Sequence, residues 1–270
     1  MQLISRPVVC LFGLSLVLTA NSAFAQEAEQ PTAPVVEAST NCFATFAIGT
    51  LTYCVSEHGN IVRFSSPAAA PEHIRIGVIR EGYAVCAATA AGGAQQVSYD
   101  SGNVEAGWQA AVTIVQPGGA NTLPLCITRR TNNNLEVQQC FSHNANEKEV
   151  VVSMTVRNLS GATRFNVMMD RYFDGDIAGS AGNDRYTRTA DAVWGEEGQH
   201  ALALRNINGV ASPAHTTAVH TFVGFNAASC NQPTIATPTA AGDFVGRLSF
   251  QFGNLVANAS RTVRVQYDKL

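Results

Sequence analysis

The chain has 270 residues, carries a formal net charge of −3 and is only 14% charged. Typical domains are about 25% charged, so its solubility rests on uncharged polar side chains. The sequence holds no basic run and no patch of basic and aromatic residues, so it lacks the usual signature of nucleic-acid-binding proteins, and we expect no nucleic-acid partner.

The first 25 residues have the pattern of a secretory signal peptide. Arg6 stands in a short basic region, an apolar run follows at 8–18, and Ala23-Phe24-Ala25 fits the small-x-small cleavage pattern. The apolar run is shorter than the roughly 20 residues that a membrane span needs. The sequence therefore predicts a bacterial-type signal peptide at 1–25, a secreted or periplasmic protein, and no transmembrane segment after signal removal.

The segment at 26–40 is rich in Ala, Pro, Glu and Thr and has no apolar periodicity. Such a segment buries too little surface to offset the entropy that it loses on ordering. We expect a flexible leader at 26–40, followed by a single folded domain at 41–270.

Six cysteines remain in the mature chain once Cys10 leaves with the signal peptide. An even number of cysteines in an oxidising compartment indicates disulfides. The chain has no C-x-x-C pair, which argues against zinc and thioredoxin-like chemistry. The six residues are Cys42, Cys54, Cys86, Cys126, Cys140 and Cys230.

Hairpin geometry predicts how these cysteines pair. Turns at 47–49 and at 132–134 would each be three residues long, the first with glycine at the left-handed position that such turns favour. Counting outward from either turn places two cysteines opposite each other, within reach of a disulfide. The predicted disulfides are Cys42–Cys54, Cys126–Cys140 and, by elimination, Cys86–Cys230.

The second half of the chain is a succession of short runs with alternating apolar and polar residues. They lie at 150–157, 164–173, 200–207, 220–225, 244–252 and 261–268, and Gly, Asn, Pro and Ser clusters separate them. Antiparallel sheets that are buried on one face give this alternation. The predicted fold is therefore all-β, a large antiparallel β-sandwich stabilised by disulfides. In two of these runs the alternation predicts which residues are buried. They are Phe165, Val167, Met169, Arg171 and Phe173 in the run at 164–173, and Val263, Val265 and Tyr267 in the run at 261–268.

The stretch DRYFDGDIAGSAGNDRY, at 170–186, carries four acidic residues on a glycine-rich segment. Calcium takes six to eight oxygen ligands, and Asp174, Asp176 and Asp184 are the predicted ligands. The spacing differs from the twelve-residue helix-loop-helix calcium loop, however, and a plain turn uses the same residue types. A third interpretation is a hairpin in which Arg171 and Arg185 neutralise the neighbouring acids without any metal.

Three stretches, HGNIVRFSSP, IREGYAVC and TVRNLSGATRFNVMMDRYFDGDI, together resemble a group of secreted bacterial proteins of uncharacterised function. The similarity covers about 58–186. It implies a large double-sheet β-sandwich of the galactose-mutarotase type and an exported location, but it implies no chemistry. The motif residues that carry it are Arg157, Asn158, Ser160, Arg171, Tyr172, Asp174 and Asp176.

The sequence leaves two functions open, and it assigns no catalytic residue. It contains no G-x-S-x-G elbow and no H-E-x-x-H motif. The first hypothesis is a non-catalytic binding or structural protein that recognises a glycan, a surface component or another protein. The alternative is a carbohydrate-active enzyme that uses carboxylates of the 170–197 region, since glycoside hydrolysis needs two of them across a cleft. No cofactor other than calcium is predicted.

Overall fold

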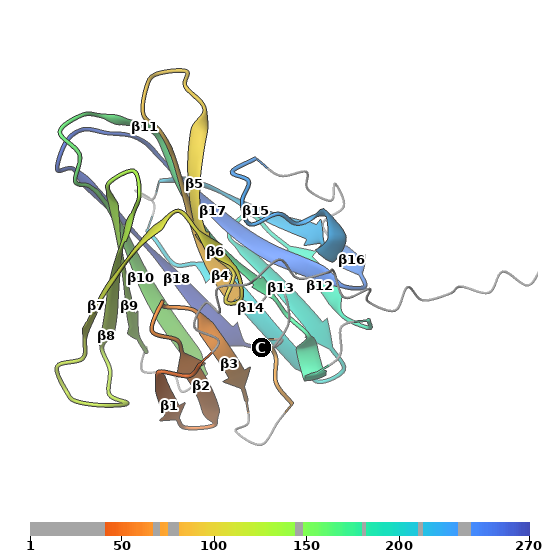
Figure 1. Ribbon diagram of the computed structural model, residues 1–270. Helices are drawn as coiled ribbons and strands as arrows, with labels where there is room; N and C mark the ends of the chain where they lie inside the picture. Colours follow the sequence, from red (N-terminus) through yellow and green to blue (C-terminus); the bar gives the residue numbers. More distant parts are fainter. Residues whose placement is uncertain are drawn as a thin grey trace, which may run out of the picture. The chain divides into compact units, whose positions relative to one another are not determined.

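The computed structural model describes residues 41–66, 71–74, 81–143, 148–179, 182–209, 213–231 and 239–270 (Figure 1). The predicted signal peptide and the predicted leader lie outside these residues. All described residues belong to the same compact unit. None of the helices in the described part has the length and the apolar character that crossing a membrane requires.

The described strands form three antiparallel sheets. The largest sheet has nine strands in the order β16 (Thr239–Ala241), β12 (Arg185–Arg188), β13 (Ala192–Glu197), β14 (His200–Asn206), β18 (Ser260–Lys269), β10 (Glu149–Asn158), β9 (Leu135–Ser142), β8 (Leu125–Thr131) and β7 (Trp108–Val115). The second has six strands in the order β15 (Ala214–Thr221), β17 (Phe244–Leu255), β11 (Arg164–Asp174), β4 (Glu81–Ala88), β5 (Gln95–Asp100) and β6 (Glu105–Ala106). The third has β1 (Ala44–Ile48), β2 (Leu51–Val55) and β3 (Ile61–Ser65). Two short 3-10 helices, η1 (Ile177–Gly179) and η2 (Phe222–Gly224), follow β11 and β15.

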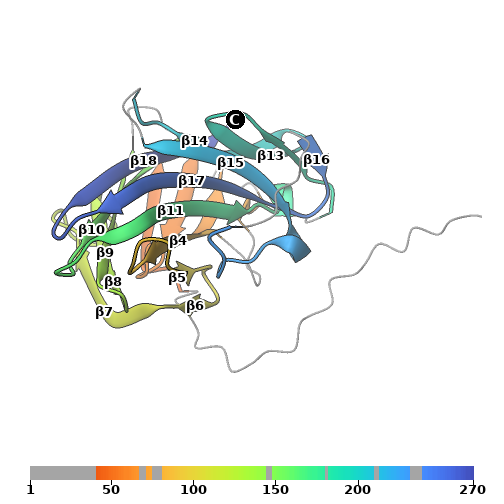
Figure 2. The same cartoon turned by 90° about the horizontal axis from the view of Figure 1, so that it is seen from above.

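The two larger sheets share one core because each has an apolar inner face. Val263 and Val265 of β18 point into it from the nine-stranded sheet, and Val167 and Met169 of β11 point into it from the six-stranded sheet. Figure 2 shows β17, β11 and β4 running side by side in the six-stranded layer. The prediction of an all-β antiparallel sandwich is therefore confirmed.

The predicted buried face of β11 is wrong at one residue. Phe165 is only half-buried and lies outside the core cluster, whereas Val167 and Met169 are fully buried. The pairing of β11 with β4 shifts register between Phe165 and Met168, and Asn166 has a φ of 50°. A β-bulge of this kind inserts a residue and reverses the alternation of side chains, so Phe165 turns away from the face that Val167 occupies.

All three predicted disulfides are present, but only one of the two hairpin registers is confirmed. Cys126 of β8 lies directly opposite Cys140 of β9. In the first hairpin, however, the strands pair Ile48 with Leu51, so the turn has two residues and Thr45 faces Cys54. Gly49, at a φ of 55°, permits this tighter turn. The disulfides are Cys42–Cys54, Cys126–Cys140 and Cys86–Cys230.

Candidate functional site

The three predicted calcium ligands are all buried around η1. Asp174 ends β11, Asp176 precedes η1, and Asp184 precedes β12. The Asp184 Oδ2 accepts a hydrogen bond from the Ile177 amide at 3.1 Å. Burial raises the pKa of Asp184 to about 8, and the nearby charges of Asp176, Glu197 and Asp243 act in the same direction. The carboxylates of Asp174, Asp176 and Asp184 do not form a group of three potential metal ligands within 4.8 Å of one another; among the described residues, only the cluster of His58, Asp100 and Glu105 does. Calcium at this loop therefore stays a prediction.

The interpretation in which Arg171 and Arg185 neutralise the loop acids is wrong. Arg171 points into the core, where it forms a buried ion pair with Glu81 and donates to the Tyr267 hydroxyl at 3.2 Å. Arg185 instead lies 3.7 Å from the exposed carboxylate of Glu196. The alternation of β11 sends Arg171 to the inner face of the sheet, away from the acids that follow the strand.

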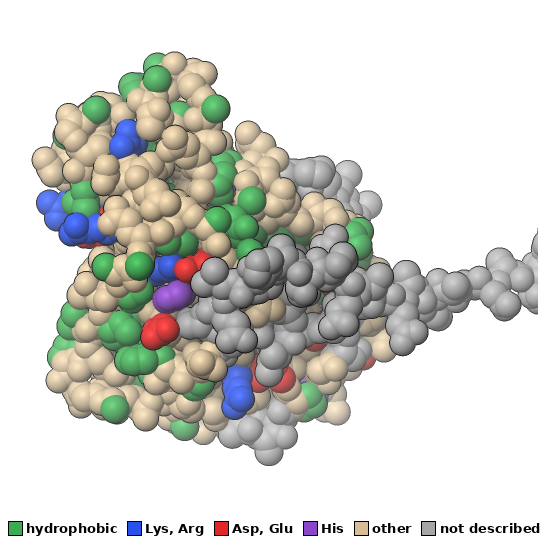
Figure 3. Space-filling view, in the orientation of Figure 1, with side chains coloured by type: hydrophobic (Ala, Val, Ile, Leu, Met, Phe, Trp, Pro, Cys, Tyr) green, Lys and Arg blue, Asp and Glu red, His purple; other side chains and the backbone are tan. Residues whose placement is uncertain are grey.

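A second ionic cluster joins the β2–β3 loop to the sandwich. The Arg129 guanidinium donates to Asp100 at 2.8 Å and to Glu105 at 2.7 Å. The His58 Nδ1 lies 3.3 Å from Asp100 Oδ2 and 3.0 Å from Glu105 Oε2. His58, Asp100 and Glu105 form the one group in the described part of the chain whose three potential metal-ligand atoms all lie within 4.8 Å of one another. On the face seen in Figure 3, acidic, basic and histidine side chains lie beside one another.

The surroundings of this ionic cluster favour the charged forms of His58 and Glu105. Burial disfavours the charged form of His58, but Asp100 and Glu105 outweigh it and raise the pKa of His58 to about 9. Burial likewise disfavours the Glu105 carboxylate, yet His58 and Arg129 lower its pKa to about 2. At neutral pH the Glu105 carboxylate therefore faces an arginine and a protonated histidine. The arrangement is that of a closed ion-pair network that holds the loop in place.

A polar groove lies on the outer face of the six-stranded sheet. On β17, Leu248 and Phe250 enter the core, so Arg247, Ser249 and Gln251 point to the opposite face. Two adjoining depressions of about 510 and 600 Å³ lie there and share three lining residues. We call them together the outer groove. Its described lining residues are Gly92, Gly93, Gln95, Asn166, Val167, Met168, Arg188, Thr216, Thr217, Ala218, Cys230, Asn231, Arg247, Ser249, Gln251 and Gly253.

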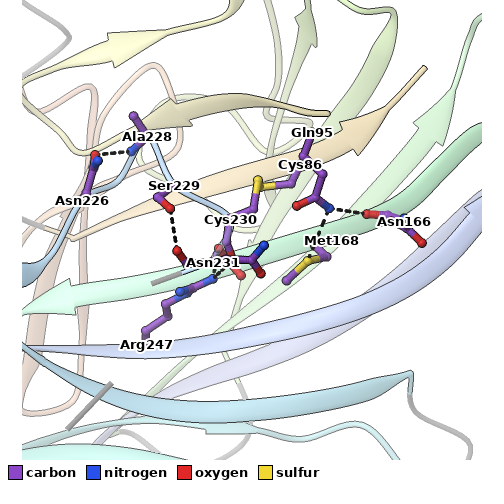
Figure 4. The surroundings of a disulfide bond; sticks show 11 residues. Cys86, Gln95, Asn166, Met168, Asn226, Ala228, Ser229, Cys230, Asn231 and Arg247 are labelled. Atoms are coloured by element: carbon purple, nitrogen blue, oxygen red, sulfur yellow. Dashed lines mark hydrogen bonds and ion pairs between the residues drawn. A yellow bond between two sulfur atoms is a disulfide. The ribbon is translucent and has the colours of Figure 1, made fainter. Parts of the chain in front are cut away.

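The disulfide Cys86–Cys230, drawn in Figure 4, lies at one side of the outer groove, where Cys230 is a lining residue. It ties the segment after η2 to β4, and Met168 belongs to the same buried cluster as the two cysteines. Cys230 also accepts a hydrogen bond from Arg247 through its backbone oxygen at 3.1 Å. Gln95, at the other end, donates to the Asn166 backbone oxygen at 3.0 Å. The wall and the floor are therefore fixed to the sheet by covalent and polar contacts.

Arg247 and Asp170 form a buried ion pair beneath the outer groove. The Arg247 Nη2 lies 2.7 Å from Asp170 Oδ2, and both residues are less than 5% exposed. Burial raises the pKa of Asp170, although Arg247 pulls it the other way. One atom of each partner, Arg247 Nε and Asp170 Oδ1, is buried without a hydrogen-bond partner. Ser249, which lines the outer groove, also hydrogen-bonds the Asp170 carboxylate, so the pair is tied to the floor of the groove.

Sequence reasoning did not find the outer groove, although part of its signal was present. The run RLSFQF at 247–252 alternates strictly, which assigns Arg247, Ser249 and Gln251 to one polar face. What the sequence alone does not supply is the neighbour of that face. The groove also needs Met168 of β11 and the segment that ends at Cys230, and only the sheet pairing and a disulfide bring these together.

Comparison with known proteins supports the fold and assigns no family or function. No family model matches the chain, and no curated protein matches it in sequence. A bacterial glucoamylase, solved in complex with acarbose, matches 88% of this chain and 34% of its own length at 9% identity with a TM-score of 0.61. The chain thus spans about a third of that enzyme.

Two smaller proteins of known structure also match. A putative aldose 1-epimerase from Escherichia coli K12 matches 84% of this chain and 98% of its own at 13% identity, with a TM-score of 0.49. A galactose mutarotase-like protein from Lactobacillus casei ATCC 334 matches 84% and 99% at 9% identity, with a TM-score of 0.42. An aldose epimerase and a mutarotase-like protein thus stand among the matched structures. The chain has a double-sheet β fold that it shares with a part of the glucoamylase.

Proposed function

We propose that the protein binds a glycan along the outer groove. The observation that carries the proposal is the lining of that groove, which combines amide and hydroxyl side chains with an apolar floor at Met168. Amide groups donate and accept hydrogen bonds at once, as sugar hydroxyls do. The volumes also fall within the roughly 300–1,000 Å³ of typical ligand sites. Asn231 and Gln251, both exposed, line the two depressions where they adjoin.

The lining of the outer groove favours binding over hydrolysis, and the fold and the disulfides agree with a sugar ligand. Glycoside hydrolysis uses two carboxylates about 5–9.5 Å apart across the bond. Among the described residues that line the outer groove, none is acidic, and Asp170 beneath it is held by Arg247. The glucoamylase that shares the fold is, by its name, a carbohydrate-active enzyme, which agrees with a sugar ligand. The three disulfides agree with an oxidising compartment, where glycans are abundant partners.

A glycan-array screen followed by calorimetry tests the proposal. The wild-type protein should bind at least one class of glycan, and Asn231→Ala and Gln251→Ala should each weaken binding about fivefold, since one lost hydrogen bond is worth about 1 kcal/mol. Gln138→Ala is the matched control, because Gln138 is an exposed amide on β9. Absence of any glycan ligand, or equal weakening by the control, would overturn the proposal.

The same ligands should be incubated with the protein in a hydrolase panel. Release of sugar that Asp170→Asn abolishes would support the enzymatic alternative instead. An unchanged ligand after incubation, together with groove-dependent affinity, supports binding.

A further inference from the structure

We propose that two copies of this chain pair through β7 and form a symmetric dimer, in which the two nine-stranded sheets continue into each other. β7 lies at one end of its sheet, beside β8, which is its only neighbour among the described strands (Figure 1). An edge strand carries a row of backbone N–H and C=O groups that no strand pairs, and a further strand can add to them. The dimer is independent of the proposed glycan binding.

β7 is the most open of the four strands at the ends of the two larger sheets. β16 and β6 have only three and two residues. β15 has eight residues, but His215 within it lies 2.8 Å from Asp191, which connects β12 to β13 in the other sheet. In β7 a hydrogen bond to the other sheet is made by the first residue, Trp108, whose indole donates to the Tyr99 backbone oxygen at 2.8 Å. The rest of β7 is free to receive a strand.

β7 also lacks the usual protection of an exposed edge. Proteins protect such edges with charged side chains, with proline or with very short strands. The eight residues of β7, WQAAVTIV, include no charged residue and no proline. A bulge lies between Trp108 and Val112, but the pairing with β8 is regular from Val112 to Val115. The second half of β7 therefore presents a regular, uncharged edge.

The side chains of β7 favour a second copy of the same strand as the partner. In an antiparallel pair centred on Thr113, Val112 lies opposite Ile114 of the second copy, and Ala111 lies opposite Val115. Apolar side chains then face apolar ones, and Val115, which is 50% exposed, gains a neighbour. A two-fold interface requires a surface that is complementary to itself. Because β7 has no charge, the symmetric pairing brings no like charges together.

A row of polar side chains crosses the outer face of the nine-stranded sheet and ends at Thr113. Each member lies directly opposite the next, in the order Thr113, Thr128, Gln138, Thr155 and Thr262. The Gln138 amide donates to the Thr128 hydroxyl at 3.3 Å, and the Thr155 and Thr262 hydroxyls lie 2.8 Å apart. In the dimer Thr113 faces its own copy, and cross-strand threonine pairs form hydrogen bonds of this kind. The row would therefore continue across the two-fold axis.

Sedimentation velocity of the purified protein tests the proposal over about 1–500 µM, because the small interface of a single strand pair gives a weak dimer. The sedimentation coefficient should rise with concentration. Thr113→Arg places two like charges opposite each other and should raise the dissociation constant of the dimer at least about tenfold. Gln138→Arg is the control, since Gln138 is exposed in the same row but lies on β9, two strands from the axis. It should leave the dimer intact.

A mixture of Thr113→Arg and Thr113→Glu proteins provides the second test. Each variant alone should stay monomeric at concentrations where the wild type dimerises, whereas the mixture should dimerise because opposite charges then meet. A circular dichroism melt of each variant confirms that it is folded. A wild type that stays monomeric over the whole range would overturn the proposal. A dimer that Thr113→Arg and Gln138→Arg weaken equally, or that the mixture does not restore, would do the same.

Discussion

Arg171 is fully buried, and it links four separate segments of the chain. Besides its ion pair with Glu81 of β4, it donates to the Tyr267 hydroxyl of β18 and to the Gly59 backbone oxygen of the β2–β3 loop, and it contacts Gln139 of β9. A buried ion pair contributes about as much to the stability of a fold as an apolar pair of similar volume, or slightly less. Removal of one partner, however, leaves the other charge buried without a counterion, which is strongly destabilising. The Arg171 side chain thus connects β4, β18, β9 and the β2–β3 loop through polar contacts.

Arg171→Met should lower the free energy of unfolding by about 3–5 kcal/mol, because the Glu81 carboxylate would remain buried without its cation. Urea unfolding of the purified protein measures the loss. Adding Glu81→Gln to Arg171→Met removes the stranded charge and should recover part of the stability. Equal losses for the single and the double variant would contradict the idea that the stranded carboxylate is the cause.

His58 should make the stability depend on pH in the alkaline range. The pKa of His58 is raised to about 9 in the folded protein, and an unfolded histidine has a pKa of about 6.5. The contribution of His58 is therefore fully present below pH 6.5 and is lost as the pH rises through about 9.

The destabilisation caused by His58→Gln should accordingly be largest near pH 6 and should nearly vanish near pH 10. Thermal melts of wild type and variant across that range measure it. The exposed residue His143 provides the control substitution, His143→Gln. A difference between wild type and His58→Gln that stays constant with pH would show that the ion pairs to Asp100 and Glu105 do not control the effect.

At the scale of single elements, alternation predicted strands well and their irregularities poorly. The pattern placed Val167, Met169 and even the charged Arg171 on the inner face of β11, which the structure confirms. It failed at Phe165 because a bulge needs only one residue, Asn166, to adopt a positive φ, and the pattern carries no sign of that. A turn one residue shorter than expected likewise shifted the first hairpin.

Neighbours across a sheet are the other limit on what the sequence predicts. Periodicity states which face a residue occupies, but it does not state which strand lies beside it. The outer groove depends on β11 beside β17 and on the link from Cys86 to Cys230, which are 144 residues apart. Asn158, one of the residues that carry the resemblance, shows the same limit. Its side-chain amide donates to the nearby Ala162 backbone oxygen, but also to that of Leu255, 97 residues away, and the sequence pattern does not indicate the second contact.

Burial and the nearby carboxylates raise the pKa of Asp184 to about 8, which favours a proton or a cation at the loop around η1. If calcium is the partner, as proposed for Asp174, Asp176 and Asp184, millimolar calcium should raise the melting temperature, since a ligand bound only by the folded state stabilises it. Asp184→Asn should abolish that rise, while the control Asp191→Asn, at an exposed carboxylate, should not. A melting temperature that calcium leaves unchanged in the wild type would reject calcium and leave a protonated Asp184.

For the whole molecule, the three disulfides differ in what they constrain. The Cys86–Cys230 bond closes a loop of 144 residues, whereas the Cys126–Cys140 bond closes a loop of 14 residues within one hairpin. In the chain-entropy account of cross-linking, these bonds contribute roughly 5 and roughly 3 kcal/mol to stability. The Cys86–Cys230 bond also attaches the groove-lining residue Cys230 to β4, so its loss should affect both the stability of the protein and the shape of the proposed binding site.

Replacement of both cysteines by alanine in each pair separates these two effects. The Cys86→Ala/Cys230→Ala protein should lose more stability in urea than the Cys126→Ala/Cys140→Ala protein, because its unfolded chain gains more freedom. Under conditions where both remain folded, the first should also bind the glycan at least tenfold more weakly, because the segment that carries Asn231 is no longer held against the sheet. The second should bind like the wild type, since its disulfide lies in the β8–β9 hairpin of the other sheet. If both variants kept full affinity, the groove wall would hold without its disulfide, and the hydrogen bond from Arg247 to the Cys230 backbone oxygen would be the contact that positions it.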